Sequence, residues 1–183
     1  NCYHKNLFSS DTAALSPYML KKVGASYIII GHSDNRAEGE TSQILKEKIN
    51  FALENKLKVI FCIGENKHEK IHNLTSKVLK KQIIQSLDSK FYDKSIIVAY
   101  EPIWSIGTGM IPQSGDLTKT IKFIKNTLKK VFKNKSVKVL YGGSVDSVNV
   151  KVLKTIKEID GYLIGGASKS NKKFIDIIKN YYR

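Results

Sequence analysis

Glu101 is the residue whose position most strongly suggests chemistry, because it follows a run of apolar residues and leads into a loop rich in small residues. A carboxylate at the end of a buried strand is costly to desolvate unless it is used. The loop that follows contains Pro102, Trp104, Gly107 and Gly109. A proline and an aromatic residue at the entrance, with glycines at the tip whose amides can approach an anion, are typical of a closing lid. A surface glutamate before an ordinary turn is the alternative.

His32 follows an earlier apolar run, in the sequence Ile30-Gly31-His32-Ser33-Asp34. Its imidazole is therefore expected to leave the end of a strand beside a hydroxyl and a carboxylate. Such a ring can take part in proton transfer near neutral pH, but a histidine after a strand is often structural. Taken alone, this histidine does not identify a function.

Two glycine pairs follow later apolar runs, and each is followed by a serine, in Gly142-Gly143-Ser144 and Gly165-Gly166-Ala167-Ser168. Glycine lets main-chain amides crowd a phosphate group, and in α/β barrels phosphate commonly lies at the loops after strands seven and eight. Two tight turns between strand and helix are the alternative. Because both pairs occur in neighbouring units, we interpret them as a candidate phosphate site.

A competing motif is the segment His68-Glu69-Lys70-Ile71-His72, which matches the H-E-x-x-H pattern of zinc proteases. Lys70 places a charge inside a segment that these enzymes normally bury, and the residues downstream supply no third ligand. We interpret the match as a coincidence and expect neither a metal nor a cofactor.

Alternating strands and helices must position these residues, because short β-branched and aromatic runs alternate with longer runs of helical period. The predicted strands are Ser26–Ile30, Lys58–Cys62, Ser95–Tyr100, Val137–Leu140 and Gly161–Ile164. The predicted helices are Pro17–Val23, Thr41–Asn55, Lys70–Leu87, Leu117–Phe132, Ser147–Thr155 and Asn171–Tyr181. We expect Ser16, Asp116 and Asp146 to cap helix starts and Gly24 to close the first helix.

This repeat predicts a parallel sheet with helices outside it, but its period does not distinguish an open sheet from a closed barrel. The position of the unusual residues favours a barrel. They follow the ends of all five predicted strands, at His32, Glu65, Glu101 and the two glycine pairs. The active site of an α/β barrel lies on that face.

The composition allows one domain, residues 1–183, with 42% hydrophobic residues. We expect a soluble cytoplasmic protein without a membrane segment, and reduced thiols at Cys2 and Cys62. The formal net charge of +15 raises the possibility of nucleic-acid binding. The lysines are spread over every predicted helix without an aromatic-interleaved basic motif, so we expect no nucleic-acid partner.

Taken together, the motifs resemble those of the triosephosphate isomerase family in order and spacing, over the whole length of the chain. They are Gly31-His32-Ser33, Cys62-Ile63-Gly64-Glu65, Ala99–Gly109, Tyr141–Val145 and Asp160–Ser168. The resemblance implies a (β/α)8 barrel, here incomplete and covering roughly strands 4 to 8. It also implies the interconversion of D-glyceraldehyde 3-phosphate and dihydroxyacetone phosphate through an enediol or enediolate, in glycolysis and gluconeogenesis.

By this resemblance Glu101 is the general base and His32 the neutral electrophile, with Ser33 and Asp34 as possible supporting residues. The substrate phosphate is expected to contact the main-chain amides of Gly107, Ser144, Gly165 and Gly166. No cofactor or metal is implied. The family forms homodimers through a loop that would fall near Phe8–Ala14, with Thr12 at its tip.

The chain departs from the family pattern in several places. It has no counterpart of the catalytic lysine at the end of the first strand, and a full barrel has about 250 residues, so roughly 65 would be missing. We therefore expect the N-terminus to be truncated and the 183 residues alone to have little or no activity. Asp34 stands where the family has a glutamate.

Two other functions remain open on the residues alone. Another phosphate-binding barrel, such as an aldolase-like or indole-pathway enzyme, would need a lysine or a second acid at a strand end, and the predicted strands show neither. A basic nucleic-acid-binding domain would show a steep salt dependence of duplex binding.

Overall fold

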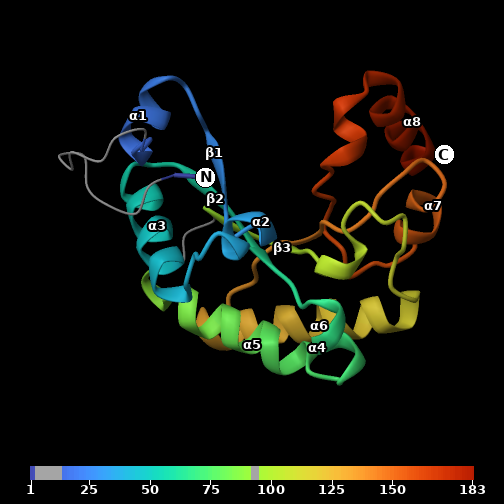
Figure 1. The fold of residues 1–183 in the computed structure, drawn as a ribbon, viewed down its shortest axis with the longest axis horizontal. Coiled ribbons are helices and arrows are strands. Elements are labelled where there is room, and N and C mark those ends of the chain that lie inside the picture. Colours follow the sequence, from blue (N-terminus) through green and yellow to red (C-terminus); the bar gives the residue numbers. More distant parts are fainter. Residues whose placement is uncertain (3–13, 92–94) are drawn as a thin grey trace.

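A computed structural model of the protein describes residues 1–2, 14–91 and 95–183. The protein contains a parallel sheet (Figure 1). Its strands are β1 (Tyr27–Ile30), β2 (Lys58–Ile63), β3 (Ile96–Tyr100) and β4 (Val139–Tyr141). They are hydrogen-bonded in the order β1-β2-β3-β4, so each strand pairs with the next one along the chain. The loop expected to contact a second subunit lies, apart from Ala14, outside the described residues.

Helices connect successive strands, as the βα repeat predicts. Their bounds are α1 (Pro17–Lys22), α2 (Ser33–Ala37), α3 (Ser42–Glu54), α4 (Lys67–Ile71), α5 (Thr75–Ser86), α6 (Ser114–Val131), α7 (Val150–Leu153) and α8 (Asn171–Tyr182), with short 3-10 turns η1 (Ser89–Phe91), η2 (Ile103–Ser105) and η3 (Gly166–Lys169). Helix α3 contacts β1 and β2, α5 contacts β2, and α6 contacts β4. Figure 1 shows α3, α5 and α6 along one side of the sheet. Among the described residues, no helix is long and apolar enough to cross a bilayer.

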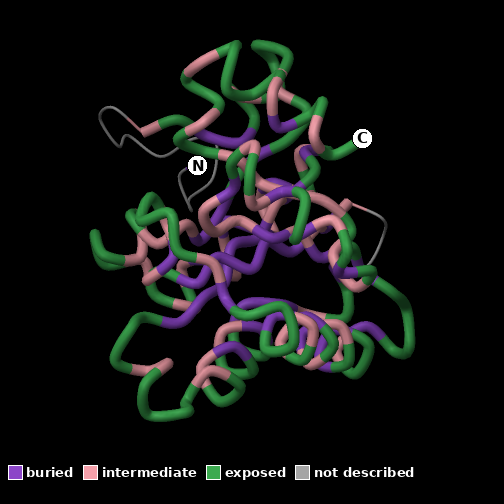
Figure 2. The backbone as a smooth tube through the Cα atoms, turned by 90° about the vertical axis from the view of Figure 1, so that its right-hand side faces the viewer, coloured by how far each residue is buried: buried purple, intermediate pink, exposed green. Residues whose placement is uncertain are grey.

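The hydrophobic core lies between the sheet and these helices. In β1, Ile28 and Ile30 are buried whereas Tyr27 and Ile29 are exposed, because alternate side chains of a strand point to opposite faces. The buried faces of α3, α5 and α6 complete the core with Leu45, Ile49, Leu79, Ile83, Leu117, Ile121, Ile124 and Leu128. Figure 2 shows the buried segments at the centre of the molecule and the exposed helix turns outside them. The helix-facing side of the sheet is thus packed.

The fifth predicted strand, Gly161–Ile164, is not a strand in the structure. Only an isolated parallel bridge joins Tyr162 to Tyr141 of β4. Main-chain hydrogen bonds link the segment to β4, from Asp160 to Val139, from Tyr141 to Gly161 and from Leu163 to Tyr141, at 2.9 to 3.0 Å. The Val139 amide donates instead to the Asp160 side chain, at 2.7 Å from Oδ2. The prediction of a fifth chain segment beside β4 is correct, but its regular strand conformation is not.

The predicted helix Lys70–Leu87 is also wrong in its extent, because two helices, α4 and α5, occupy this region. Asn73 between them has a φ of 56°. This left-handed conformation interrupts a helix, and asparagine tolerates it better than most residues. The helix α2 was not expected.

Two of the predicted helix caps hold and two differ. Ser16 accepts the Met19 amide at 3.2 Å, and Gly24, with a φ of 93°, follows α1. Helix α6 begins at Ser114, so Asp116 lies within its first turn and does not cap it. Asp146 Oδ1 accepts the Val148 and Asn149 amides at 2.7 and 2.8 Å, so it caps the turn before α7.

Candidate active site

Glu101 directly follows β3, and hydrogen bonds from both neighbouring segments fix its main chain. Its amide donates to the Ile63 carbonyl at 2.8 Å, and the Gly142 amide donates to the Tyr100 carbonyl at 2.8 Å. Two glycines make room for it. A Cβ at Gly64 would lie 1.8 Å from the Glu101 carbonyl oxygen, and one at Gly142 would lie 2.6 Å from Glu101 Cγ. The glycines after β2 and β4 therefore allow this carboxylate to sit between the strands.

The Glu101 carboxylate is buried, with 4% of the residue exposed. Burial raises the pKa of Glu101 above its usual value, and the neighbouring His32 partly offsets this effect. Its Oε2 has no hydrogen-bond partner among the described residues and lies 3.9 Å from His32 Nε2. A desolvated carboxylate with a free oxygen has a high affinity for a proton, as a general base requires.

His32 occupies the N-cap position of α2. Its Nδ1 accepts the Asp34 amide at 3.3 Å. In this hydrogen bond Nδ1 is the acceptor, which leaves Nε2, the atom that faces Glu101, as the donor nitrogen of the ring. The His32 ring is thus positioned to donate a hydrogen bond to a ligand bound beside the carboxylate.

Arg36, which we did not predict, links the ends of β1 and β2 next to this pair. Its Nε donates to the Gly31 carbonyl at 2.7 Å and its Nη2 to the Cys62 carbonyl at 2.9 Å. Its guanidinium also lies 5.7 Å from the centre of the Phe61 ring. A basic residue four positions after a strand-end histidine is too common a pattern to have indicated this role.

The lid segment is attached to the sheet through Glu65, which is fully buried. Its Oε1 accepts hydrogen bonds from Trp104 Nε1 at 3.0 Å and from the Tyr100 hydroxyl at 3.1 Å. Burial raises the pKa of the Glu65 carboxyl, and the Trp104 hydrogen bond acts in the opposite direction. Glu65 therefore anchors the loop entrance and does not face the ligand cavity.

We expect Glu65→Gln to change the pH dependence of stability. The folded protein binds the Glu65 proton more tightly than the unfolded chain, so the stabilisation from the protonated carboxyl is complete below the ordinary pKa of 4.5 and is lost as the pH rises through the higher folded pKa. Glutamine does not titrate. The free energy of unfolding of the variant relative to the wild type should therefore increase with pH across this window, as measured by urea unfolding.

Glu54→Gln is the matched control, because Glu54 is exposed on α3. The control should show a much smaller change relative to the wild type over the same pH range. A Glu65→Gln difference that stays constant with pH would contradict the burial argument.

The tip of the lid is joined to the Gly142–Ser144 segment. Ser144 Oγ accepts the Gly109 amide at 3.0 Å and donates to the Ser105 carbonyl at 2.6 Å. The Ser105 hydroxyl contacts the Tyr141 hydroxyl at 3.0 Å and donates to the Met110 carbonyl at 2.6 Å. These hydrogen bonds hold the lid over the carboxyl end of the sheet.

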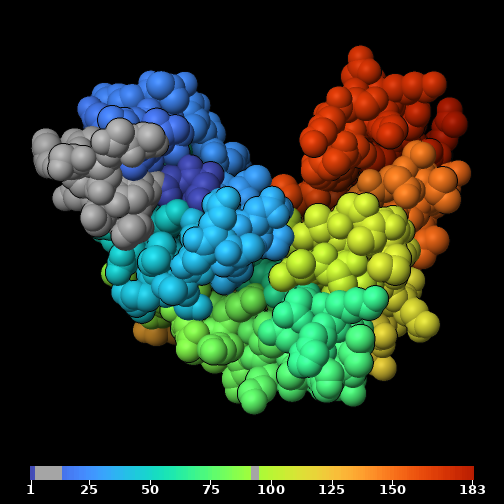
Figure 3. All heavy atoms as spheres, viewed as in Figure 1, coloured from blue at the N-terminus to red at the C-terminus, as the bar shows by residue number. Residues whose placement is uncertain are grey.

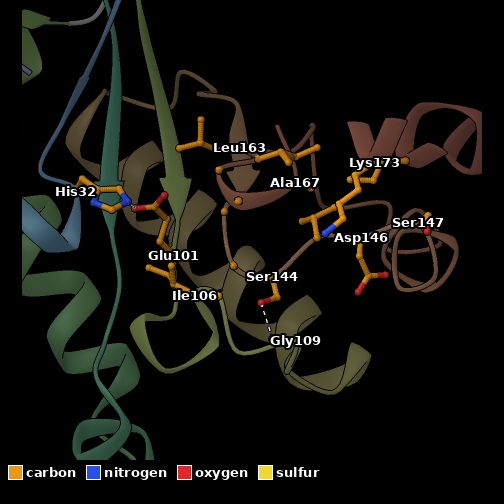
Figure 4. Close-up of a pocket in the computed structure, with 18 of the residues that line it drawn as sticks. His32, Glu101, Ile106, Gly109, Ser144, Asp146, Ser147, Leu163, Ala167 and Lys173 are labelled. Atoms are coloured by element: carbon orange, nitrogen blue, oxygen red, sulfur yellow. Dashed lines mark hydrogen bonds and ion pairs between the residues drawn. The ribbon is translucent and has the colours of Figure 1, made fainter. Parts of the chain in front are cut away.

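A cavity of about 500 Å³ opens at this end of the sheet. The space-filling view shows the surface hollowed between the N-terminal and C-terminal parts of the chain (Figure 3). The close-up shows His32 and Glu101 directed toward each other at one side of the cavity (Figure 4). All six residues predicted to be catalytic or to bind substrate line it, namely His32, Glu101, Gly107, Ser144, Gly165 and Gly166.

The remaining predictions have mixed outcomes in the structure. Ser33 and Asp34 are not among the lining residues. Asp34 nevertheless contacts His32 Nδ1 with both its amide, at 3.3 Å, and its exposed carboxylate, whose Oδ2 lies 3.4 Å away. The Ser144 amide, predicted to contact phosphate, donates to Ser105 Oγ at 3.3 Å. This is a long hydrogen bond that a stronger acceptor could replace.

The H-E-x-x-H segment forms the short helix α4 and its turn. Glu69 Oε2 accepts the Asn66 amide at 2.8 Å, while Asn66 Oδ1 accepts the Glu69 amide at 2.8 Å. This capping box uses the carboxylate that a protease would need as its base. No group of three possible metal ligands gathers within the described parts of the chain.

Comparisons with known proteins all indicate one family. A family model described as triosephosphate isomerase matches residues 1–181. The triosephosphate isomerase of Thermodesulfovibrio yellowstonii is 38% identical over 182 residues, which are 98% of this chain and 74% of that protein. The one from Geotalea uraniireducens is 40% identical over 92% of this chain and 69% of its own length. The crystal structure of triosephosphate isomerase from Bartonella henselae superposes with a TM-score of 0.87 at 32% identity, covering 100% of this chain and 75% of that one.

Proposed function

Because the chain belongs to the triosephosphate isomerase family, we propose that its protein interconverts D-glyceraldehyde 3-phosphate and dihydroxyacetone phosphate, a step of glycolysis and gluconeogenesis. The reaction is an aldose–ketose isomerisation, in which one carbon is oxidised and its neighbour reduced within the same molecule. The observation that supports this proposal most is the approach of Glu101 Oε2 to His32 Nε2, at 3.9 Å, beside a cavity lined by glycine loops.

In the proposed reaction Glu101 removes a proton from the carbon next to the substrate carbonyl. The carboxyl then returns the proton to the neighbouring carbon of the enediol or enediolate. Burial raises the pKa of Glu101, which strengthens it as a base. The triosephosphate isomerase family is a known example of a glutamate base and a histidine whose pKa values are adjusted by their surroundings.

His32 is proposed to polarise the substrate carbonyl from its Nε2–H. The hydrogen bond from the Asp34 amide to Nδ1 supports the proposal of a neutral ring that donates from Nε2. A neutral imidazole is a weaker acid than an imidazolium ion. It can therefore keep its proton in the presence of Glu101 and donate a hydrogen bond to the developing enediolate oxygen. The Asp34 carboxylate, which stands in place of the family glutamate, lies 3.4 Å from His32 Nδ1 on the side of the ring away from Glu101.

The substrate phosphate is proposed to lie against the amides of Gly107, Ser144, Gly165 and Gly166. Their loops line the cavity opposite the base, so a bound phosphate would hold the reacting carbon near Glu101. A phosphate oxygen would replace Ser105 Oγ as the acceptor for the Ser144 amide. The lid would exclude water from the enediolate and so limit the loss of phosphate.

We further propose that β1 to β4 and the segment at Tyr162 correspond to strands four to eight of a (β/α)8 barrel and that residues 1–183 belong to a single barrel domain. The sheet order and the bridge to β4 support this correspondence. The homodimer and the cytoplasmic location of glycolytic isomerases are proposed for this protein as well.

The proposed function predicts solvent exchange during turnover. With dihydroxyacetone phosphate as substrate in deuterium oxide, the protein expressed from its own gene should form glyceraldehyde 3-phosphate that carries deuterium at the carbon next to the carbonyl. Proton NMR measures both conversion and labelling. Absence of isomerisation would contradict the proposal. For the 183-residue chain alone, our prediction remains little or no turnover.

Treatment with borohydride separates this function from an aldolase-like barrel. An aldolase of the lysine type forms a Schiff base, so borohydride would inactivate it in the presence of substrate. We expect borohydride to leave the isomerase active. Covalent trapping of the substrate would favour the aldolase-like function.

A further inference from the structure

The charges that line the cavity are poorly matched to a phosphate ester. Among the described lining residues, the charged side chains comprise three carboxylates, Glu101, Asp146 and Asp176, and one ammonium group, Lys173. A phosphate dianion entering this space meets like charges, whose repulsion is strong where water is partly excluded. A cation within the cavity therefore has a large influence on phosphate affinity.

The other acidic groups do not neutralise Lys173. Both Asp146 carboxylate oxygens accept hydrogen bonds within the turn before α7, from the Val148 and Asn149 amides and from Asn149 Nδ2. Among the ion pairs found in the described parts of the chain, none includes Lys173. Its ammonium group is available to an anionic ligand.

Lys173 also stands where a lysine is unfavourable without such a ligand. It is in the first turn of α8, where its amide donates to Ser170 Oγ at 3.4 Å, and this turn contains Lys172 but no acidic residue. Amides at a helix start carry partial positive charge, so lysines there experience repulsion that an anion would relieve. Figure 4 shows the Lys173 side chain extending from α8 into the cavity, toward the loop that carries Ser144 and Asp146.

We propose that Lys173 is a phosphate-binding residue, whose ammonium group contacts the substrate phosphate between the Ser144 loop and the Gly165–Gly166 turn. This inference rests on the proposed function and adds a side-chain cation to the main-chain amides of Gly107, Ser144, Gly165 and Gly166. The cation offsets the three carboxylates of the cavity. It therefore contributes to affinity and leaves the proton transfer by Glu101 unchanged.

The test compares Lys173→Gln with Lys172→Gln in the protein expressed from its own gene. Lys172 is the adjacent residue, is exposed and does not line the cavity, so its variant controls for the loss of one charge from the same helix turn. We expect Lys173→Gln to weaken binding of inorganic phosphate about 10-fold, the lower range for a hydrogen bond to a charged group because the lysine is exposed. Isothermal titration calorimetry measures this affinity without turnover.

Kinetics provide an independent readout. Lys173→Gln should raise KM for both triose phosphates by a similar factor with kcat nearly unchanged, and Lys173→Arg should restore most of the affinity. Equal phosphate affinities for the Lys173→Gln and Lys172→Gln variants would overturn the inference, as would a loss confined to kcat. If the wild type lacks isomerase activity but Lys173→Gln still weakens phosphate binding, the proposed function fails and the phosphate contact stands.

Discussion

Replacing Glu101 with glutamine is expected to lower kcat by about 10²- to 10⁴-fold, the usual contribution of a positioned general base. Glutamine keeps the size of the side chain and can still face His32, but its amide cannot accept the substrate proton. The phosphate loops are unchanged, so affinity for inorganic phosphate should remain within a small factor of the wild type. Steady-state kinetics in both directions and calorimetry measure the two effects.

A matched variant distinguishes the effect of the negative charge of Glu101 from the effect of its side-chain length. Glu101→Asp keeps the carboxylate but withdraws it by one carbon–carbon bond, about 1.5 Å. We expect its kcat to lie between those of Glu101→Gln and the wild type. Near-normal turnover of Glu101→Gln would show that another group is the base.

The second large effect is expected from Gly142→Ala. The added methyl group would lie 2.6 Å from Glu101 Cγ and 2.9 Å from its Oε1, so the carboxylate must move. Because displacement of a catalytic group by about 1 Å can reduce the rate about 10²-fold, we expect a loss of this order in kcat. The overpacking should also lower the free energy of unfolding by about 1–3 kcal/mol.

Gly115→Ala is the control for this substitution. Gly115 lies in the first turn of α6, where an added Cβ meets no atom within 4 Å. Alanine favours helix more than glycine does, so this variant should keep full activity and be equally or more stable. A Gly142→Ala enzyme with wild-type kcat would mean that Glu101 adjusts without cost, contrary to the geometry.

The sequence predicts the convergence of the candidate site correctly, and the reason is topological. The carboxyl ends of neighbouring parallel strands meet at one edge of the sheet, so residues that follow β1, β3 and β4 must lie close together. His32, Glu101 and Ser144 need only the positions of their strands to be placed on this edge. The strands are short apolar runs, which periodicity detects well.

The contacts that decide the role of each residue could not be predicted in this way. Glu65 follows a strand end exactly as Glu101 does in the pattern, yet it bonds to Tyr100 and Trp104 and anchors the lid. The orientation of a side chain toward the cavity or toward the lid depends on neighbours distant in sequence. The proposed role of Lys173 could not be predicted for the same reason, because its helix resembles any other lysine-rich helix.

Local conformation explains the errors in the fold. The break between α4 and α5 depends on one left-handed residue, Asn73, within a segment whose apolar period continues. The segment at Tyr162 keeps main-chain hydrogen bonds to Tyr141 but forms only a single bridge with β4, and the Val139 amide donates to the Asp160 side chain. Apolar periodicity contains no information about either local feature.

The guanidinium group of Arg36 connects the ends of β1 and β2, beside the candidate base, so that they move together as one rigid unit. By holding the Gly31 and Cys62 carbonyls together, it couples the main chain at His32 to that at Gly64, which in turn abuts the main chain of Glu101. Thermal motion should therefore shift the imidazole and the carboxylate in concert. Their mutual spacing would then fluctuate less than the position of either group in the molecule.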